Sequence, residues 1–148
     1  MKIDRRKLRA WINKNLTPVK VVYDDCFSYV NRDQTVTICT ELPDHYEEYE
    51  AFCKHRGLKY KVHPMVICLL HEIGHDQTLL FLNEFYYTID HIIDKITGTY
   101  SYTELGRKLK YSLYFRSPVE VAATDWLVDF VNNNIDEVRE LETYVTEG

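Results

Sequence analysis

Residues 71–75 read His71-Glu72-Ile73-Gly74-His75. They lie in a segment predicted to be a helix over residues 63–77, because His63-Pro64 opens it and proline is favoured at the first helical position. Histidines four positions apart on a helix differ by about 40° of rotation, so both imidazoles point to one side and can share a tetrahedral zinc ion. Glu72 lies about 60° from His75, where it can take a proton from zinc-bound water. This H-E-x-x-H pattern predicts a zinc site with Glu72 as catalytic base.

The opposite side of the same helix is apolar. Val66, Leu69, Leu70 and Ile73 fall away from the two histidines and give that side a core to pack against. We therefore expect the histidines to face a cleft.

A catalytic zinc ion needs a third protein ligand and an open fourth position. The metzincin extension of the motif is excluded, since Thr78 stands where glycine belongs and Phe81 where the third histidine belongs. A carboxylate or histidine further along the chain must serve instead. The candidates are Glu84, Asp90, His91, Asp94, Glu104 and Glu120.

Glu120 fits best among these candidates. It opens a predicted helix, and its neighbours Ala123 and Thr124 are small enough to let two helices approach closely. The competing interpretation is a capping box, in which the Glu120 side chain reaches back to Ser117. A carboxylate that binds zinc is less free to cap, so the two interpretations partly exclude each other.

The rest of the chain predicts an α+β domain. Three β-rich runs between residues 19 and 40 predict a small antiparallel sheet, with a turn at Asn31-Arg32-Asp33-Gln34. Helices are expected before the sheet, over residues 4–15, and after it in nearly all of the remaining sequence. The later helices are expected at residues 44–56, 63–77, 79–96, 103–115, 117–132 and 135–144. With 148 residues, no internal repeat and few Gly and Pro residues, a single domain over residues 1–148 is expected.

Composition limits the partners and the compartment. The net charge is −5, and although residues 1–20 carry +6, an acidic protein argues against nucleic acid as a partner. No apolar run is long enough to cross a membrane or to act as a signal peptide. Cys26, Cys39, Cys53 and Cys68 are widely spaced with no C-x-x-C pair, which predicts reduced thiols and a cytoplasmic protein.

Two segments together resemble a known family. The helix His71 to His75, followed by Glu120-Val121-Ala122-Ala123-Thr124-Asp125-Trp126-Leu127, is similar to the small zincin-like (gluzincin) peptidases of the ImmA/IrrE type. The resemblance covers about a third of the chain. It implies one zinc ion per chain held by His71, His75 and Glu120. Such proteins are frequent in phages and mobile elements, where some act on a transcriptional repressor. Residues 79–115 form an inserted helical hairpin by comparison with the family.

The sequence leaves several candidates for the residues that would assist the zinc ligands. The group that orients the zinc histidines could be Thr124, Asp76 or Asp90, while Asp125 points away and is expected at the surface. A donor for the developing oxyanion is needed as well, and six side chains qualify. These are Tyr100, Tyr102, Tyr111, Tyr114, Arg116 and His91. By analogy with zincins, the strand at Thr35 to Cys39 is expected to be the edge strand that pairs with a peptide substrate.

The sequence therefore supports two functional hypotheses. The first is a zinc-dependent metallopeptidase that hydrolyses a peptide bond in a protein or peptide substrate, such as a regulatory protein. The second is a catalytically silent, zincin-like binding module that acts on a regulatory partner. The presence of Glu72 favours the first, because a purely structural zinc site needs no base.

Overall fold

The structure is a computed structural model that describes residues 3–16, 20–23, 28–30, 35–39, 41–78, 84–99 and 103–146. One helix and three short strands come first and helices dominate the rest, which confirms the α+β class. The elements in chain order are α1 (Arg5–Asn15), β1 (Lys20–Tyr23), β2 (Ser28–Val30), β3 (Thr35–Ile38), α2 (Tyr46–His55), α3 (Pro64–Thr78), α4 (Glu84–Thr99), α5 (Glu104–Phe115), α6 (Pro118–Asn133) and α7 (Ile135–Thr146).

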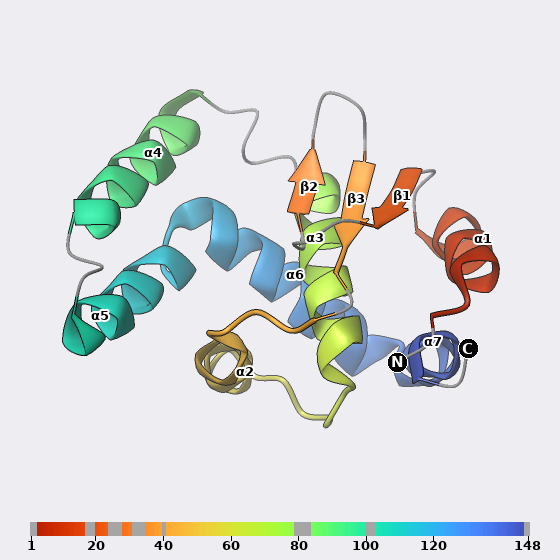
Figure 1. Ribbon diagram of the computed structural model, residues 1–148. Helices are drawn as coiled ribbons and strands as arrows, with labels where there is room; N and C mark the ends of the chain where they lie inside the picture. The colour runs from red at the N-terminus through yellow and green to blue at the C-terminus, as the bar shows by residue number, and fades with distance from the viewer. Residues whose placement is uncertain are drawn as a thin grey trace.

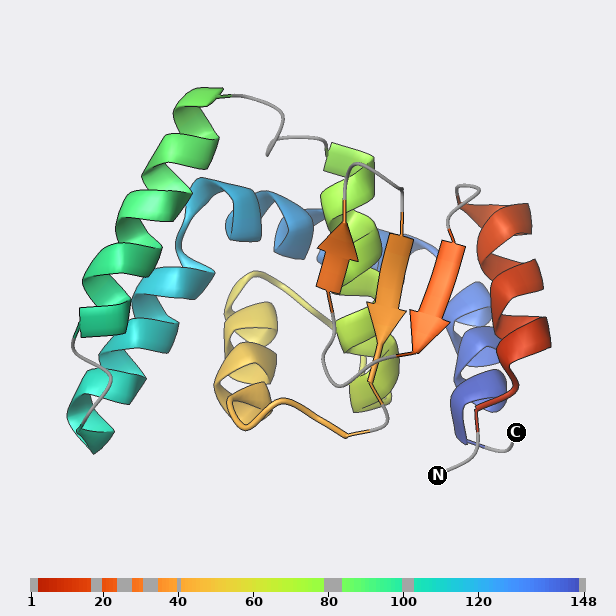
Figure 2. The same ribbon diagram turned by 45° about the horizontal axis from the view of Figure 1, so that its top comes forward.

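The sheet is mixed, so the expectation of an antiparallel sheet was wrong. Its strand order is β1-β3-β2, with β3 in the middle (Figure 2). Strands β2 and β3 pair antiparallel, with Val30 opposite Thr35, as expected for two strands joined through residues 31–34. Strand β1 pairs with β3 in parallel, with Lys20 opposite Thr35. Alternation of apolar and polar residues sets which face of a strand is buried, but it does not determine which strands become neighbours.

Helices α3 and α6 form the centre of the molecule. They pack against each other, and α3 also contacts strands β2 and β3 (Figure 1). Helix α3 is buried around most of its circumference, and Val66, Leu70 and Ile73 are fully inaccessible to solvent. Each such side chain contributes roughly 1.5–3 kcal/mol through burial. The expected core face of the H-E-x-x-H helix is thus confirmed.

Four of the other helices flank this centre on two sides. Helices α1 and α7 pack together on one side, where the Asp4 backbone N–H donates to the carbonyl of Tyr144 over 2.8 Å. Helices α4 and α5 contact each other on the opposite side, and both also touch α6 (Figures 1 and 2). The hairpin expected within residues 79–115 is therefore present as α4 and α5, although residues 79–83 lie outside the described part of the chain.

Local signals fix several helix ends. Gly57 has φ of +105°, and it ends α2 in a left-handed conformation that glycine adopts without strain. At the start of α6, the Ser117 hydroxyl accepts a hydrogen bond from the Glu120 N–H, with Pro118 in the first turn. The end of α2 and the start of α6 were predicted from the sequence to within two residues.

No described helix combines the length and the apolar character needed to cross a bilayer. Cys39, Cys53 and Cys68 are free thiols, as expected, and Cys26 lies outside the described residues.

Candidate metal centre

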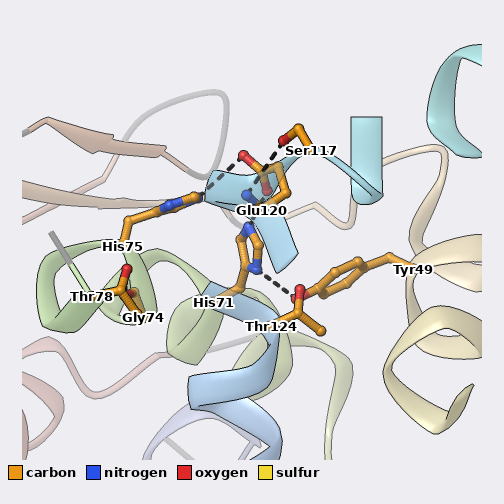
Figure 3. A network of polar contacts seen from close by, with 8 residues as sticks. All are labelled: Tyr49, His71, Gly74, His75, Thr78, Ser117, Glu120 and Thr124. Atoms are coloured by element: carbon orange, nitrogen blue, oxygen red, sulfur yellow. Dashed lines mark hydrogen bonds and ion pairs between the residues drawn. The ribbon is translucent and has the colours of Figure 1, made fainter. Parts of the chain in front are cut away.

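Helix α3 presents His71 and His75 one turn apart on the same side. Their ring centroids are 4.7 Å apart, and the side chains are directed toward the start of α6 (Figure 3). Because the other side of α3 is packed into the core, this orientation is set by burial of the apolar residues.

Glu120 in the first turn of α6 completes the group. Its Oε2 lies 2.7 Å from Nε2 of His71, and its Oε1 lies 3.4 Å from Nε2 of His75 (Figure 3). The carboxylate does not form the capping box that the sequence also allowed, because the Ser117 N–H donates instead to the carbonyl of Tyr114. Glu120 is only 4% exposed and His71 only 8%.

Close packing of α3 against α6 makes this meeting possible. Gly74 lies directly against Ala123, and a Cβ atom at Gly74 would be 2.6 Å from the Ala123 carbonyl oxygen. Only glycine on α3 and a small residue on α6 allow the backbones to come so near. The expected role of Ala123 in close approach is confirmed, whereas the requirement for Gly74 was not foreseen.

The donor atoms of His71, His75 and Glu120 all lie within 4.8 Å of one another. Ligand atoms around one tetrahedral zinc ion are about 3.4 Å apart, given bond lengths of roughly 2.1 Å. Of the separations here, the one between Glu120 and His75 equals that value at 3.4 Å and the one between Glu120 and His71 is shorter at 2.7 Å. Two imidazoles with one carboxylate are a donor set that divalent metals accept. The buried group could therefore hold a metal ion.

Electrostatics fit a cation at this position. Burial alone would raise the pKa of Glu120, but the imidazoles of His71 and His75 hold it well below its usual range. Burial alone would lower the pKa of His75, yet the hydrogen bond and charge of Glu120, with the charges of Glu72 and Asp90, raise it overall. Glu120 is thus a buried anion, and a proton on an imidazole or a bound metal can neutralise it.

Glu72 lies beside the group and faces a cleft of about 420 Å³. His71 and Glu120 line the same cleft. The other walls come from α2, α5 and the segment after β3, and they combine aromatic side chains with the charged side chains of Glu41, Asp44 and Lys110. The aromatic side chains of these walls include Tyr46, Tyr49, Tyr111, Tyr114 and Phe115, and the Cys68 thiol of α3 also lines the cleft. Burial raises the pKa of the Cys68 thiol to about 12, so the cleft contains a neutral thiol there.

The other candidates for the third ligand do not join the group. Glu84, His91 and Glu104 are exposed on α4 and α5. Asp90 is half-buried and near enough to influence the pKa of His75, but it is not among the converging donors of the described residues. The side chain of Asp94 lies outside the described part.

The candidate oxyanion donors separate in the structure. Tyr111 and Tyr114 on α5 line the cleft, whereas His91 and Arg116 are exposed. Burial raises the pKa of Tyr114 well above its usual range, and the charge and hydrogen bond of Glu120 add to this. Tyr114 therefore keeps its proton beside the metal group. Tyr100 and Tyr102 lie outside the described residues.

The side chain that contacts Nδ1 of His71 was not foreseen from the sequence. The hydroxyl of Tyr49 on α2 lies 2.5 Å from Nδ1 of His71 and 3.1 Å from Oγ1 of Thr124 (Figure 3). Thr124, one of the predicted candidates, thus reaches His71 only through Tyr49. Asp76 is buried and accepts from the Gln77 amide over 3.1 Å. No local pattern distinguishes Tyr49 from the other eleven tyrosines.

Two further expectations concern the surroundings of the site. Strand β3 is central in the sheet, so the expectation that it is the substrate-binding edge was wrong; β2 is the edge strand that contacts α3. Asp125 lies at the surface, as expected, where it forms an ion pair with Arg56 at 2.6 Å.

Comparison with models of known families, with curated proteins and with solved structures finds no match to this chain. The zincin resemblance of the two motif segments therefore stays a prediction.

Proposed function

We propose that this protein is a zinc-dependent metallopeptidase of minimal zincin-like architecture. One observation carries the proposal. Two imidazoles and a carboxylate from two different helices converge within 4.8 Å, and Glu72 lines the adjoining cleft. A purely structural zinc site is closed by four protein ligands, whereas here three donors converge and two of them, His71 and Glu120, border an open cleft.

Each residue has a distinct role in this proposal. His71, His75 and Glu120 would hold the zinc ion. Zinc, when bound, polarises the scissile carbonyl and acidifies the attacking water molecule. Glu72 would accept the proton of that water and deliver it to the leaving amine. The phenol of Tyr114, kept protonated beside Glu120, is the best-placed hydrogen-bond donor for the carbonyl oxygen.

The cleft supports a peptide as the substrate. Its volume of about 420 Å³ lies within the range of ligand sites, and its aromatic walls suit a large apolar side chain. By the family resemblance, the substrate is proposed to be a regulatory protein such as a transcriptional repressor.

Metal content tests the site. Elemental analysis of the purified protein should find about one zinc ion per chain. The ion should be lost in both His75→Ala and Glu120→Ala, while Glu72→Gln should retain it. Absence of zinc from the wild-type protein, even after incubation with zinc, would refute the proposed site. Retention of zinc in Glu120→Ala would mean that another residue is the third ligand.

Hydrolysis is tested separately with a mixture of quenched fluorescent peptides of randomised sequence. The zinc-loaded wild-type protein should cleave members of the mixture, and Glu72→Gln, with the same zinc content, should not. A wild-type protein that binds zinc and cleaves none of the peptides would favour the second hypothesis, a binding module. Equal cleavage by Glu72→Gln would exclude Glu72 as the base.

A further inference from the structure

A buried contact chain runs from α2 through the metal group to α6. The Tyr49 hydroxyl stands between Nδ1 of His71 and the hydroxyl of Thr124, and its distances to them are 2.5 and 3.1 Å. Thr124 is fully buried and Tyr49 nearly so, so water does not compete for these bonds. Tyr49 and His71 also pack edge to face, with ring centroids 4.9 Å apart.

We infer that Tyr49 and Thr124 act together as positioning residues, and that they set the orientation and the hydrogen position of the His71 ring for metal binding. The inference rests on the proposed metal site but not on peptidase activity. Second-sphere partners of metal-binding histidines are usually a carboxylate, a backbone carbonyl or water. In this protein the partner is a tyrosine, and a threonine supports it.

The hydrogen-bond directions explain why both residues are needed. A metal binds a lone pair on Nε2 of His71, so the ring hydrogen must then be on Nδ1. Nδ1–H donates to the Tyr49 oxygen, and the Tyr49 O–H then needs an acceptor elsewhere. The Thr124 oxygen is an acceptor within reach, at 3.1 Å, and the Cys53 sulfur, a much weaker acceptor, also interacts with the Tyr49 hydroxyl.

When Nε2 of His71 is bonded to Glu120 instead of a metal, the hydrogen bonds along this chain run in the opposite directions. Glu120 is ionised and can only accept, so at a distance of 2.7 Å the Nε2 of His71 carries the hydrogen. In a neutral imidazole, Nδ1 then offers a lone pair to which the Tyr49 O–H can donate. When a metal rather than the Glu120 carboxylate is the partner of His71 Nε2, the Tyr49 hydroxyl must therefore turn from His71 to Thr124.

Thr124 matters for metal binding in this scheme although it reaches His71 only through Tyr49. The isosteric change Thr124→Val leaves the Tyr49 O–H able to donate to His71 when Nε2 is bonded to Glu120. When Nε2 binds a metal, it leaves the same O–H with the weakly accepting Cys53 sulfur in place of an oxygen. Thr124→Val should therefore weaken metal binding even though the ligands themselves are intact.

The test measures the dissociation constant for zinc alone, by competition with a chromophoric chelator. Tyr49→Phe and Thr124→Val should each weaken binding roughly 10- to 100-fold, as loss of an outer-sphere partner does. The double variant should bind about as Tyr49→Phe does, because a phenylalanine side chain has no hydroxyl left to satisfy. Thr124→Ser keeps the hydroxyl and should restore wild-type affinity.

Tyr46→Phe is the matched control. Tyr46 lies one turn before Tyr49 on α2 and lines the same cleft, and its buried hydroxyl has no hydrogen-bond partner among the described residues. The zinc affinity of Tyr46→Phe should equal that of the wild type. Circular dichroism verifies that each variant is folded, and Thr124→Val carries the test if Tyr49→Phe does not fold.

The outcomes separate the inference from the proposed function. Wild-type affinity in both Tyr49→Phe and Thr124→Val would overturn the inference and leave the metal site standing. If the losses of zinc-binding free energy in the two single variants simply added up in the double variant, the shared role of the two residues would be overturned. A wild-type protein that binds no zinc would overturn the metal site and this inference together.

Discussion

Replacement of Gly74 by alanine should separate the two central helices and disable the metal group. Gly74 lies on α3 between the two histidines, and its Cα faces the backbone of Ala123 on α6. The added Cβ would be 2.6 Å from the Ala123 carbonyl oxygen, 3.1 Å from Cα and 3.2 Å from the carbonyl carbon. All three are backbone atoms, so no side-chain rotation can relieve the overlap.

The size of the effect follows from these distances. Ordinary contact begins at 3.4 Å, so the helices must separate by about 0.8 Å, the difference between 3.4 and 2.6 Å. Overpacking of this kind costs about 1–3 kcal/mol, and the better helix propensity of alanine returns about 1 kcal/mol. We expect the free energy of unfolding to fall by about 0–2 kcal/mol. Metal ligands must be placed to within about 0.2 Å, so zinc affinity should fall on the order of 10- to 100-fold.

Two measurements check this expectation. Chelator competition gives the zinc affinity, and urea unfolding in the presence of EDTA gives the stability of the metal-free protein. Gly57→Ala is the matched control, because Gly57 has a left-handed φ but no atom within 4 Å of the added Cβ. It should lose roughly 1–2 kcal/mol of stability and keep its zinc affinity. Wild-type zinc affinity in Gly74→Ala would refute the close-packing argument.

Three further predictions concern pH, a helix cap and a surface ion pair. Because the pKa of His75 is raised on folding, His75 stabilises the folded protein below its unfolded pKa of 6.5, and this stabilisation is lost as the pH rises. Because the pKa of Glu120 is lowered on folding, Glu120 stabilises the folded protein above its unfolded pKa of 4.5, and this stabilisation is lost as the pH falls. The cluster should therefore stabilise the metal-free protein most between pH 4.5 and 6.5. Because zinc competes with protons for the ligands, the rise in Tm that zinc causes should grow between about pH 5 and pH 8. A zinc-induced rise in Tm that does not depend on pH would contradict this prediction. Ser117→Ala removes the acceptor for the Glu120 N–H and should cost about 1 kcal/mol in urea unfolding; no loss would mean that this cap contributes nothing. Arg56→Ala breaks an ion pair with Asp125 whose side chains are 38% and 42% exposed, so stability should change by less than about 1 kcal/mol and zinc affinity not at all.

Local sequence signals predicted most of the helices and much of the candidate site. Proline and serine before α6 and glycine after α2 act within a few residues, so their effects can be read without tertiary structure. The same is true of His71 and His75, because helix geometry alone puts them on one side. Glu120 was found from the small residues after it, which indicated where two helices could meet.

Features that depend on distant segments could not be predicted in this way. The position of β3 between β1 and β2 depends on which strands find each other, and four-residue strands carry little information about this. Tyr49 contacts His71 only because α2 packs against α5 and α6, and nothing in the sequence around Tyr49 points to a histidine 22 positions away. The need for glycine at position 74 likewise appears only when α6 is in place.

The shortness of β2 has a consequence for how selective the proposed peptidase would be. Three residues of this edge strand are described, so an extended peptide lying along them could form only a few backbone hydrogen bonds. At about 1 kcal/mol each, these amount to roughly 3 kcal/mol, which is weaker than millimolar affinity. Backbone pairing, which is indifferent to sequence, would contribute little. Recognition would then depend on side chains that fill the aromatic cleft, and such an enzyme discriminates among sequences where a general protease does not.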